Sequence, residues 1–198
     1  MKRVFLTSFV ALLLSACSGY EPVLDEMTDY RPETEARVRL FGQNSKASVL
    51  TSAIDCAAGK KGENTVVGGS AGGFWQPLTG MRSHTLGITA TEHSRQIRGR
   101  GLRNTFFREL EIPAGMPVNV QAPFTGVSAQ YVAEEIITLG EGTCNSSKGS
   151  FIPESGKDYE VIGLNRKKGC GVAVFEVDKK SGALTPVPVA GPVSCLRR

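Results

Sequence analysis

The sequence is poor in the residue types that build catalytic and metal sites. Its only histidines are His84 and His93, and its five cysteines include no pair with the Cys-x-x-Cys spacing of zinc sites. No apolar stretch approaches the roughly 20 residues that a membrane-spanning helix needs, and no long amphipathic helix can be traced. The net charge of +4 over 198 residues is too small to indicate a nucleic acid partner. We therefore expect no metal, no cofactor and no nucleic acid.

The N-terminus has the three-part layout of a secretory signal. Met1-Lys2-Arg3 is positively charged, residues 4–14 are almost wholly apolar, and Ser15-Ala16 are small residues that a signal peptidase accepts. The apolar run is too short to stay in a bilayer as a span. The sequence therefore predicts a removable signal peptide over residues 1–16.

Leu14-Ser15-Ala16-Cys17 resembles the lipobox of bacterial lipoproteins. The resemblance implies that the Cys17 thiol receives a diacylglycerol, that the chain is cut before Cys17, and that the new amino group is acylated, with palmitate among the chains. Two or more acyl chains give durable anchoring. Ser18 stands where the inner-membrane retention signal of enteric lipoproteins has Asp, so the resemblance favours the outer membrane, facing the periplasm. The alternative is ordinary secretory cleavage that leaves Cys17 as a plain thiol.

The mature chain is predicted to be a tether followed by one domain. Residues 17–35 are polar and acidic, lack a hydrophobic period and contain Pro22 and Pro32, which predicts a flexible tether. Residues 36–198 are enough for a single domain with its own core. Loss of Lys2 and Arg3 with the signal lowers the net charge from +4 to near +2.

Four cysteines remain once Cys17 is assigned to lipid. An even number in an exported chain predicts two disulfides, for which three pairings are possible. We predict that Cys170 pairs with Cys195 and Cys56 with Cys144, because the first two flank a predicted terminal hairpin.

Short segments with a period of two predict an all-β fold. Val38 and Leu40 alternate with Arg37 and Arg39, which is typical of a half-buried strand. Further strands are expected near residues 47–54, 106–112, 116–121, 170–177 and 184–189, and residues 151–161 are expected to form a strand, a turn and a second strand. Residues 131–139 are expected to form a strand because strands flank them, although Val132, Ile136 and Leu139 also have the spacing of a helix. We predict one antiparallel β-sandwich.

The connections between these strands follow from glycine and proline. Residues 58–73 are rich in glycine and are expected to form a long exposed loop. The two strands on either side of Pro113-Ala114-Gly115 are expected to form a hairpin. The prolines within residues 184–189 place that strand at a sheet edge.

Two segments resemble small β-sandwich lipoproteins of unknown function that are distantly similar to PEGA-like envelope modules. They are Ile112-Pro113-Ala114-Gly115 with the alternating strand that follows, and the run from Phe151 to Tyr159. The resemblance implies a sandwich over about residues 36–178 and brings no catalytic residues.

Gly68-Gly69-Ser70-Ala71-Gly72 matches the G-x-S-x-G expression of serine hydrolases. That motif needs a helix directly after the serine, but Gly73-Phe74-Trp75-Gln76-Pro77 is a poor helix start. It also needs an acid and a histidine well downstream, and His84 and His93 do not fit. We therefore expect Ser70 to have no catalytic role.

Arg95, Arg98, Arg100 and Arg103 form the one basic cluster of note. Guanidinium groups bind phosphate or carboxylate through paired hydrogen bonds, so the cluster is a candidate contact for an anionic polymer, a lipid headgroup or an envelope protein; a solvated loop is the alternative. His84 and His93 have no acid or cysteine cluster near them in sequence and are expected to be surface residues.

Two functions fit these observations. The first is a lipid-anchored, non-enzymatic envelope protein that holds or recognises a partner, with residues 59–73 and 95–103 as the candidate contact surface. The second is an anionic-ligand binder, or an envelope hydrolase that uses Ser70. The first is the preferred expectation, because no catalytic motif survives its context.

Overall fold

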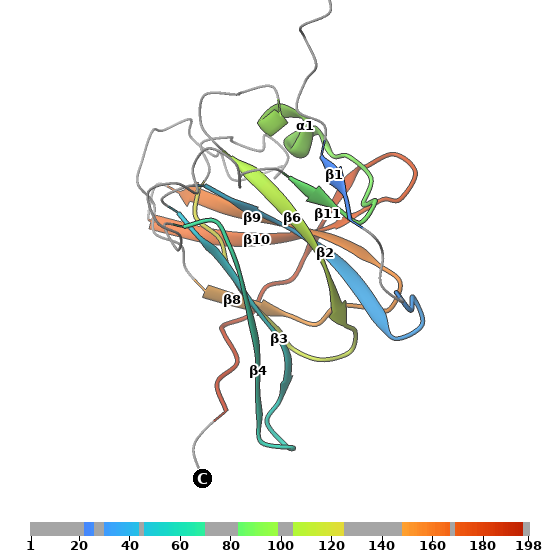
Figure 1. The fold of residues 1–198 in the computed structure, drawn as a ribbon. Coiled ribbons are helices and arrows are strands. Elements are labelled where there is room, and N and C mark those ends of the chain that lie inside the picture. The colour runs from blue at the N-terminus through green and yellow to red at the C-terminus, as the bar shows by residue number, and fades with distance from the viewer. Residues whose placement is uncertain are drawn as a thin grey trace, which may run out of the picture.

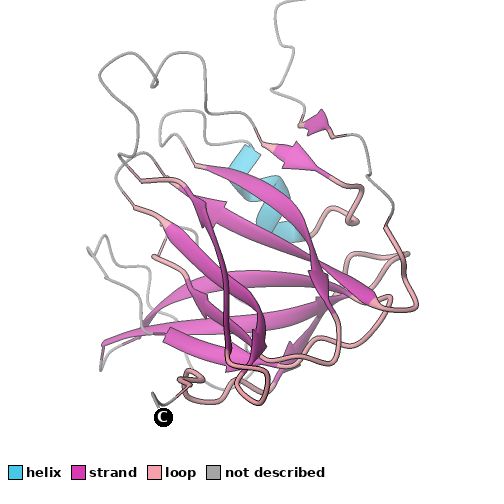
Figure 2. Ribbon diagram, turned by 60° about the horizontal axis from the view of Figure 1, so that its bottom comes forward, coloured by secondary structure: helices cyan, strands magenta, loops and turns pink. Residues whose placement is uncertain are grey.

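The computed structural model describes residues 22–25, 30–43, 46–69, 83–98, 105–124, 148–166 and 169–195. These residues form two mostly antiparallel β-sheets that pack against each other (Figure 1). The predicted all-β sandwich is confirmed. One short helix, α1 (Glu92–Arg98), is the single helical element in this described part of the chain (Figure 2).

The larger sheet has seven strands. Their order is β1 (Val23–Leu24), β5 (His84–Thr85), β6 (Phe106–Pro113), β2 (Glu35–Gly42), β9 (Asp158–Arg166), β10 (Gly169–Val177) and β11 (Leu184–Val187). The pairs β1–β5, β5–β6 and β2–β9 are parallel. The predicted proline-marked strand, β11, lies at the sheet edge as expected.

The smaller sheet has four strands. Their order is β4 (Lys60–Val67), β3 (Ser48–Asp55), β7 (Val118–Gln121) and β8 (Lys148–Phe151). All of its pairings are antiparallel.

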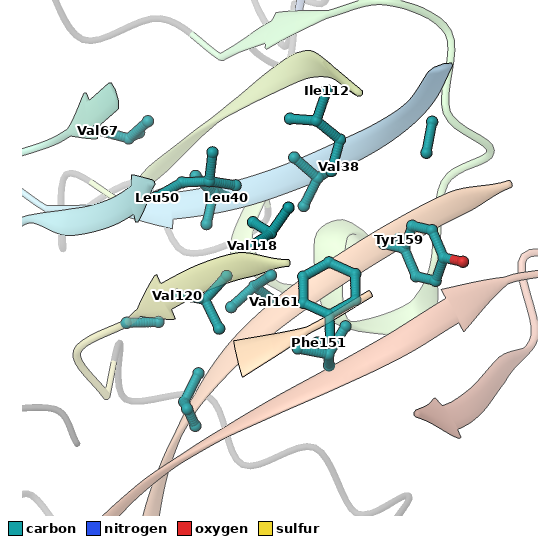
Figure 3. Packing of buried hydrophobic residues seen from close by; sticks show 14 residues of the cluster. Val38, Leu40, Leu50, Val67, Ile112, Val118, Val120, Phe151, Tyr159 and Val161 are labelled. Atoms are coloured by element: carbon teal, nitrogen blue, oxygen red, sulfur yellow. The ribbon is translucent and has the colours of Figure 1, made fainter. Parts of the chain in front are cut away.

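The core lies between the two sheets and follows the period of two (Figure 3). Val38, Leu40 and Val161 of the larger sheet face Leu50 and Val120 of the smaller one, and all five are at most 1% exposed. Alternate residues of β2 thus face the core, as the sequence predicts.

The Pro113-Ala114-Gly115 corner does not close a hairpin. β6 pairs with β2 in the larger sheet, whereas β7 pairs with β3 and β8 in the smaller one. The prediction of two strands was right and their mutual pairing was wrong. The corner instead carries the chain between the sheets, and it is held by a hydrogen bond from the Gly115 N–H to the Pro153 carbonyl at 2.8 Å.

Residues 58–69, the described part of the glycine-rich stretch, do not form the long loop that we expected. Lys60–Val67 forms strand β4, which pairs with β3 in a hairpin. Gly62, inside β4, has a positive φ of 89°, and a Cβ there would lie 2.6 Å from the Ser52 carbonyl oxygen, so glycine permits the close approach of the two strands at this point. Glycine here serves close strand packing, so its abundance is a poor sign of disorder.

Part of the predicted tether joins the sheet. Val23 pairs with His84 and Leu24 with Thr85, in the parallel register of β1 on β5. The ordered domain therefore includes residues before the predicted boundary at residue 36.

The predicted disulfide pairing is wrong. Cys56, just after β3, bonds to Cys195 across a sequence separation of 139 residues. Cys170 is also disulfide-bonded, and Cys144 lies outside the described residues. The prediction failed because Cys170 and Cys195 flank the β10–β11 hairpin in sequence only. After β11 the chain crosses to the smaller sheet, where Ala190 pairs with Ser150, and so it does not return to Cys170.

We call residues 188–195 the C-terminal strap. Its Ala190 forms a β-bridge with Ser150 of β8, and the backbone of Val193 makes two hydrogen bonds of 2.8 Å with the Asn119 side chain of β7. Because Val118 and Val120 face the core, Asn119 lies on the outer face of the smaller sheet. The strap thus crosses that face from β8 to the disulfide at Cys56.

Removing the strap's disulfide should lower stability strongly. We expect Cys56→Ser/Cys195→Ser to reduce the free energy of unfolding by about 2–4 kcal/mol, since the bond closes a long loop of the unfolded chain. Urea denaturation under non-reducing conditions measures the loss. Ser194→Ala, at an exposed neighbouring position, is the matched control and should change little; equal effects of the two variants would contradict the prediction.

Candidate functional site

The outer face of the seven-stranded sheet carries rows of charged residues in register. Arg39 of β2 lies opposite Glu109 of β6 on one side and Glu160 of β9 on the other. One step along the sheet, Arg37 lies beside Asp158. These side chains alternate with the core residues of the same strands, so they point away from the sandwich core.

Arg39 is the centre of this network. Its Nε and Nη2 donate to one Glu109 oxygen, Oε1, at 2.9 and 2.7 Å, and its Nη1 donates to Glu160 Oε2 at 2.9 Å. The three side chains are at most 1% exposed. The guanidinium carbon lies 5.0 Å from the centre of the Phe107 ring, a cation–π arrangement. Charged pairs this deeply buried need such hydrogen bonding to offset their lost hydration.

A segment of the chain covers these charges and is held by them. We call residues 83–94 the covering segment. Glu109 Oε2 accepts hydrogen bonds from the backbone N–H groups of Leu86 and Ile88 at 2.6 and 3.0 Å, and from the Thr85 hydroxyl at 2.8 Å. Arg39 Nη2 donates to the Ile88 carbonyl at 2.6 Å. Backbone groups that have no strand partner here are thus satisfied by side chains of the sheet beneath.

Glu160 holds the far end of the covering segment. It accepts hydrogen bonds from the Thr91 hydroxyl at 2.8 Å, and its Oε1 lies 2.9 Å from His93 Nδ1. Burial alone would raise the pKa of the Glu160 carboxyl. The hydrogen bond and charge of His93, together with those of Arg39, outweigh burial and lower that pKa below its ordinary value.

His93 is buried, so the expectation of a surface residue is wrong. Its ring packs edge-on against Phe41, with 4.5 Å between ring centres, and its Nε2 has no hydrogen-bond partner among the described residues. An imidazole oriented by a carboxylate is also the arrangement of a general base. The His93 and Glu160 side chains are both 0% exposed, however, so no substrate reaches them in this conformation.

Arg37 makes a similar set of contacts at the more exposed side of the network. Its Nε and Nη2 donate to the two oxygens of Asp158, both at 2.8 Å, and its Nη1 donates to the Leu86 carbonyl at 2.7 Å. The Tyr30 ring lies 5.2 Å from its guanidinium carbon. Arg37 therefore binds β9 and the covering segment at once, whereas Arg39 binds β6, β9 and the covering segment.

A cavity of about 540 Å³ lies between β10 and residues 186–191. Most of its lining side chains are small and apolar, and Lys148 is the only ionisable one among the described lining residues. Cys170 in its wall is disulfide-bonded. This lining suits contact with apolar groups and offers no acid–base pair.

The structure describes few of the predicted site residues. Arg95 lies on α1, is exposed, and donates to the Ala90 carbonyl at 2.9 Å. The side chain of Arg98 and all of Arg100, Arg103, Ser70 and Cys17 lie outside the described residues. The predicted arginine cluster and the predicted lipid site therefore stay predictions.

His84 does have a charged partner. Its Nδ1 lies 2.7 Å from Asp25 Oδ1, a contact between β5 and the residue that follows β1. Within the described ranges, no group of three or more His, Cys, Asp or Glu side chains is placed to hold a metal ion. No helix among these residues is long and apolar enough to cross a membrane.

The network could not be predicted from any one strand, because its charges come from β6, β2 and β9. Three strands carry charges at alternate positions: Arg37 and Arg39, Glu109 and Glu111, and Asp158 and Glu160. The strand in the middle, β2, carries the basic pair, and the strands on either side, β6 and β9, carry the acidic pairs. This complementary spacing was the available signal that the strands are neighbours with a covered outer face.

The chain matches no protein-family model, no curated protein and no solved structure.

Replacing Arg39 should lower the stability of the folded protein strongly. We expect Arg39→Met to lower the free energy of unfolding by about 3–5 kcal/mol, because it leaves Glu109 and Glu160 buried without their cation. Arg31→Met is the control; Arg31 forms an exposed pair with Glu35, and we expect a loss below about 1 kcal/mol. Urea denaturation compares the two, and equal losses would rule out a central role for Arg39.

Low pH should weaken the network because it protonates the Glu160 carboxylate. A lowered folded-state pKa means that ionised Glu160 adds stability above the ordinary pKa of 4.5, and that this stability is lost as the pH falls through the lowered value. We expect wild type to be more stable than Glu160→Gln at pH 7 and the difference to shrink below pH 4.5. Denaturation curves between pH 7 and pH 3 test this, and a difference that grows on acidification would contradict it.

Proposed function

We propose that this protein is a lipid-anchored, non-enzymatic component of the bacterial cell envelope that holds or recognises a partner. The observation that carries the proposal is Leu14-Ser15-Ala16-Cys17 at the end of a short apolar signal. Acylated Cys17 anchors the chain in the outer membrane, with the domain facing the periplasm. Each buried methylene of an acyl chain contributes about 0.8 kcal/mol, so multiple chains hold the protein durably.

The disulfide between Cys56 and Cys195 supports an exported protein. Such bonds persist in oxidising compartments such as the periplasm and are rare in the reducing cytosol. The two cysteines lie on separate elements and fix the C-terminal strap over a sheet, which is a structural use of the bond. This agrees with an export signal at the other end of the chain.

The buried network supports a binding role in preference to catalysis. Arg39, Glu109, Glu160 and His93 are the described residues that most resemble catalytic groups, and their polar atoms hold the covering segment in place. Turnover would need that segment to leave, which would expose several buried charges. These groups are better explained as contacts that hold the covering segment on the sheet.

The exposed β3–β4 hairpin and the corner turns offer surfaces for a partner. β4 is an edge strand whose residues are mostly exposed, with Lys60 and Lys61 at its start. Two exposed apolar side chains lie nearby: Met116 follows the Pro113-Ala114-Gly115 corner, and Ile152 precedes Pro153, whose carbonyl that corner binds. Edge strands and isolated apolar side chains of this kind are common in protein contacts.

Replacement of Cys17 tests the anchor. In wild type, we expect the N-terminal peptide to begin at residue 17 with attached acyl chains, the protein to incorporate labelled palmitate, and the label to follow the outer membrane. Cys17→Ser should lose the label entirely. Mass spectrometry of the N-terminal peptide and membrane fractionation make the measurement.

Two neighbouring variants sharpen this test. Ser18→Ala should keep the label and the location, whereas Ser18→Asp should move the protein toward the inner membrane. A wild-type protein that keeps Met1, or that carries an unmodified thiol at residue 17, would refute the proposal.

A further inference from the structure

The first strand fastens the start of the chain to the sheet. The Val23 N–H donates to the Ser83 carbonyl at 2.8 Å, and the Asp25 N–H donates to the Thr85 carbonyl at 2.9 Å. The Asp25 carboxylate also lies 2.7 Å from His84 Nδ1. Two backbone hydrogen bonds and one side-chain contact therefore hold β1 on β5.

This attachment shortens the reach of the anchor. Five residue steps separate Cys17 from Pro22, the first described residue, and a fully extended chain spans at most about 18 Å over that distance. A free tether that reached to residue 35 would span about 65 Å. With β1 in place, one edge of the larger sheet stays close to the acylated residue.

The strand register shows which end of the domain this is. β5 lies level with the start of β6, since His84 pairs with Arg108. β6 then runs five further residues, about 17 Å, to Pro113 and the corner turn. Figure 1 shows β1 near one end of the molecule and the β3–β4 hairpin at the other.

The exposed apolar side chains fall at different distances from the anchor. Leu24 of β1 is 73% exposed and follows Cys17 by only seven residues. Ile152 is 61% exposed and precedes Pro153, whose carbonyl binds the corner at Gly115. A leucine next to a lipid anchor can enter the interface between headgroups and acyl chains. Ile152 has no such proximity.

We propose that the end of the domain that carries β1 lies against the phospholipid surface, with Leu24 in its interface. The β3–β4 hairpin and the turn at Ile152 then point away from the bilayer. This inference rests on the lipid attachment of Cys17 proposed above. It adds a fixed orientation, which a long flexible tether would not give.

Site-specific photocrosslinking tests the orientation. A benzophenone amino acid replaces Leu24 in one variant and Ile152 in another, each is irradiated in native membranes, and phospholipid adducts are counted by mass spectrometry. We expect at least a fivefold higher adduct yield at position 24. Equal yields, or a higher yield at position 152, would overturn the inference.

A longer tether supplies the matched control. An insert of about 20 Gly and Ser residues between Ser18 and Gly19 keeps the lipobox and frees the domain from the bilayer. We expect it to bring the yield at position 24 down to that at position 152. An unchanged difference would show that the tether does not set the orientation, and would also overturn the inference.

The two proposals fail in distinguishable ways. An unacylated wild-type Cys17 would refute the lipid anchor itself. Acylated protein in the membrane fraction with equal adduct yields would leave the anchor standing and would refute only the orientation.

Discussion

The structure depends on one buried guanidinium. Arg39 sits between Glu109 and Glu160 on three adjacent strands and also binds the carbonyl of Ile88 above them. Without it, two carboxylates would face each other's negative charge in a region closed to water. The central strands and the covering segment thus meet at this cation, and Arg37 makes a second such contact to β9 and the covering segment.

Around Arg39, the two faces of the larger sheet are both covered and differ in chemistry; elsewhere, Phe41 with Phe107 and Ile162 with Leu164 and Phe175 form small apolar clusters. One face packs against the smaller sheet through aliphatic side chains, including Val38 and Leu40. The other is covered by a short segment with little regular structure, whose backbone groups need partners in the absence of a sheet. Glu109 supplies them, accepting from two backbone N–H groups and one hydroxyl. The charged outer face of the sheet therefore stabilises the irregular covering segment. An apolar face would leave the peptide groups of that segment without hydrogen-bond partners.

Period and turn chemistry predicted several of the strands but missed β4 and β1, and they did not reveal which strands pair. The alternation in β2, the corner at Pro113-Ala114-Gly115 and the edge position of β11 follow from local rules. The burial of Arg39, the Cys56–Cys195 bond and the docking of β1 depend on segments that are far apart in sequence. Local patterns carry no direct information on such contacts, although the complementary charges of three strands hinted at one of them. For the candidate site, the sequence neighbours of a residue were misleading. The carboxylate that contacts His93 belongs to Glu160, 67 residues away.

The parallel pairing of β2 with β9 has a consequence for how the chain folds. Arg39 and Glu160 are 121 residues apart, so the middle of the larger sheet consists of contacts with a very high sequence separation. Such contacts close slowly, because a long loop loses entropy before any of them forms. Until β9 arrives, β2 offers an open strand edge that invites aggregation. A chain with this topology should therefore be prone to aggregation in the interval between its synthesis and the closing of its central sheet.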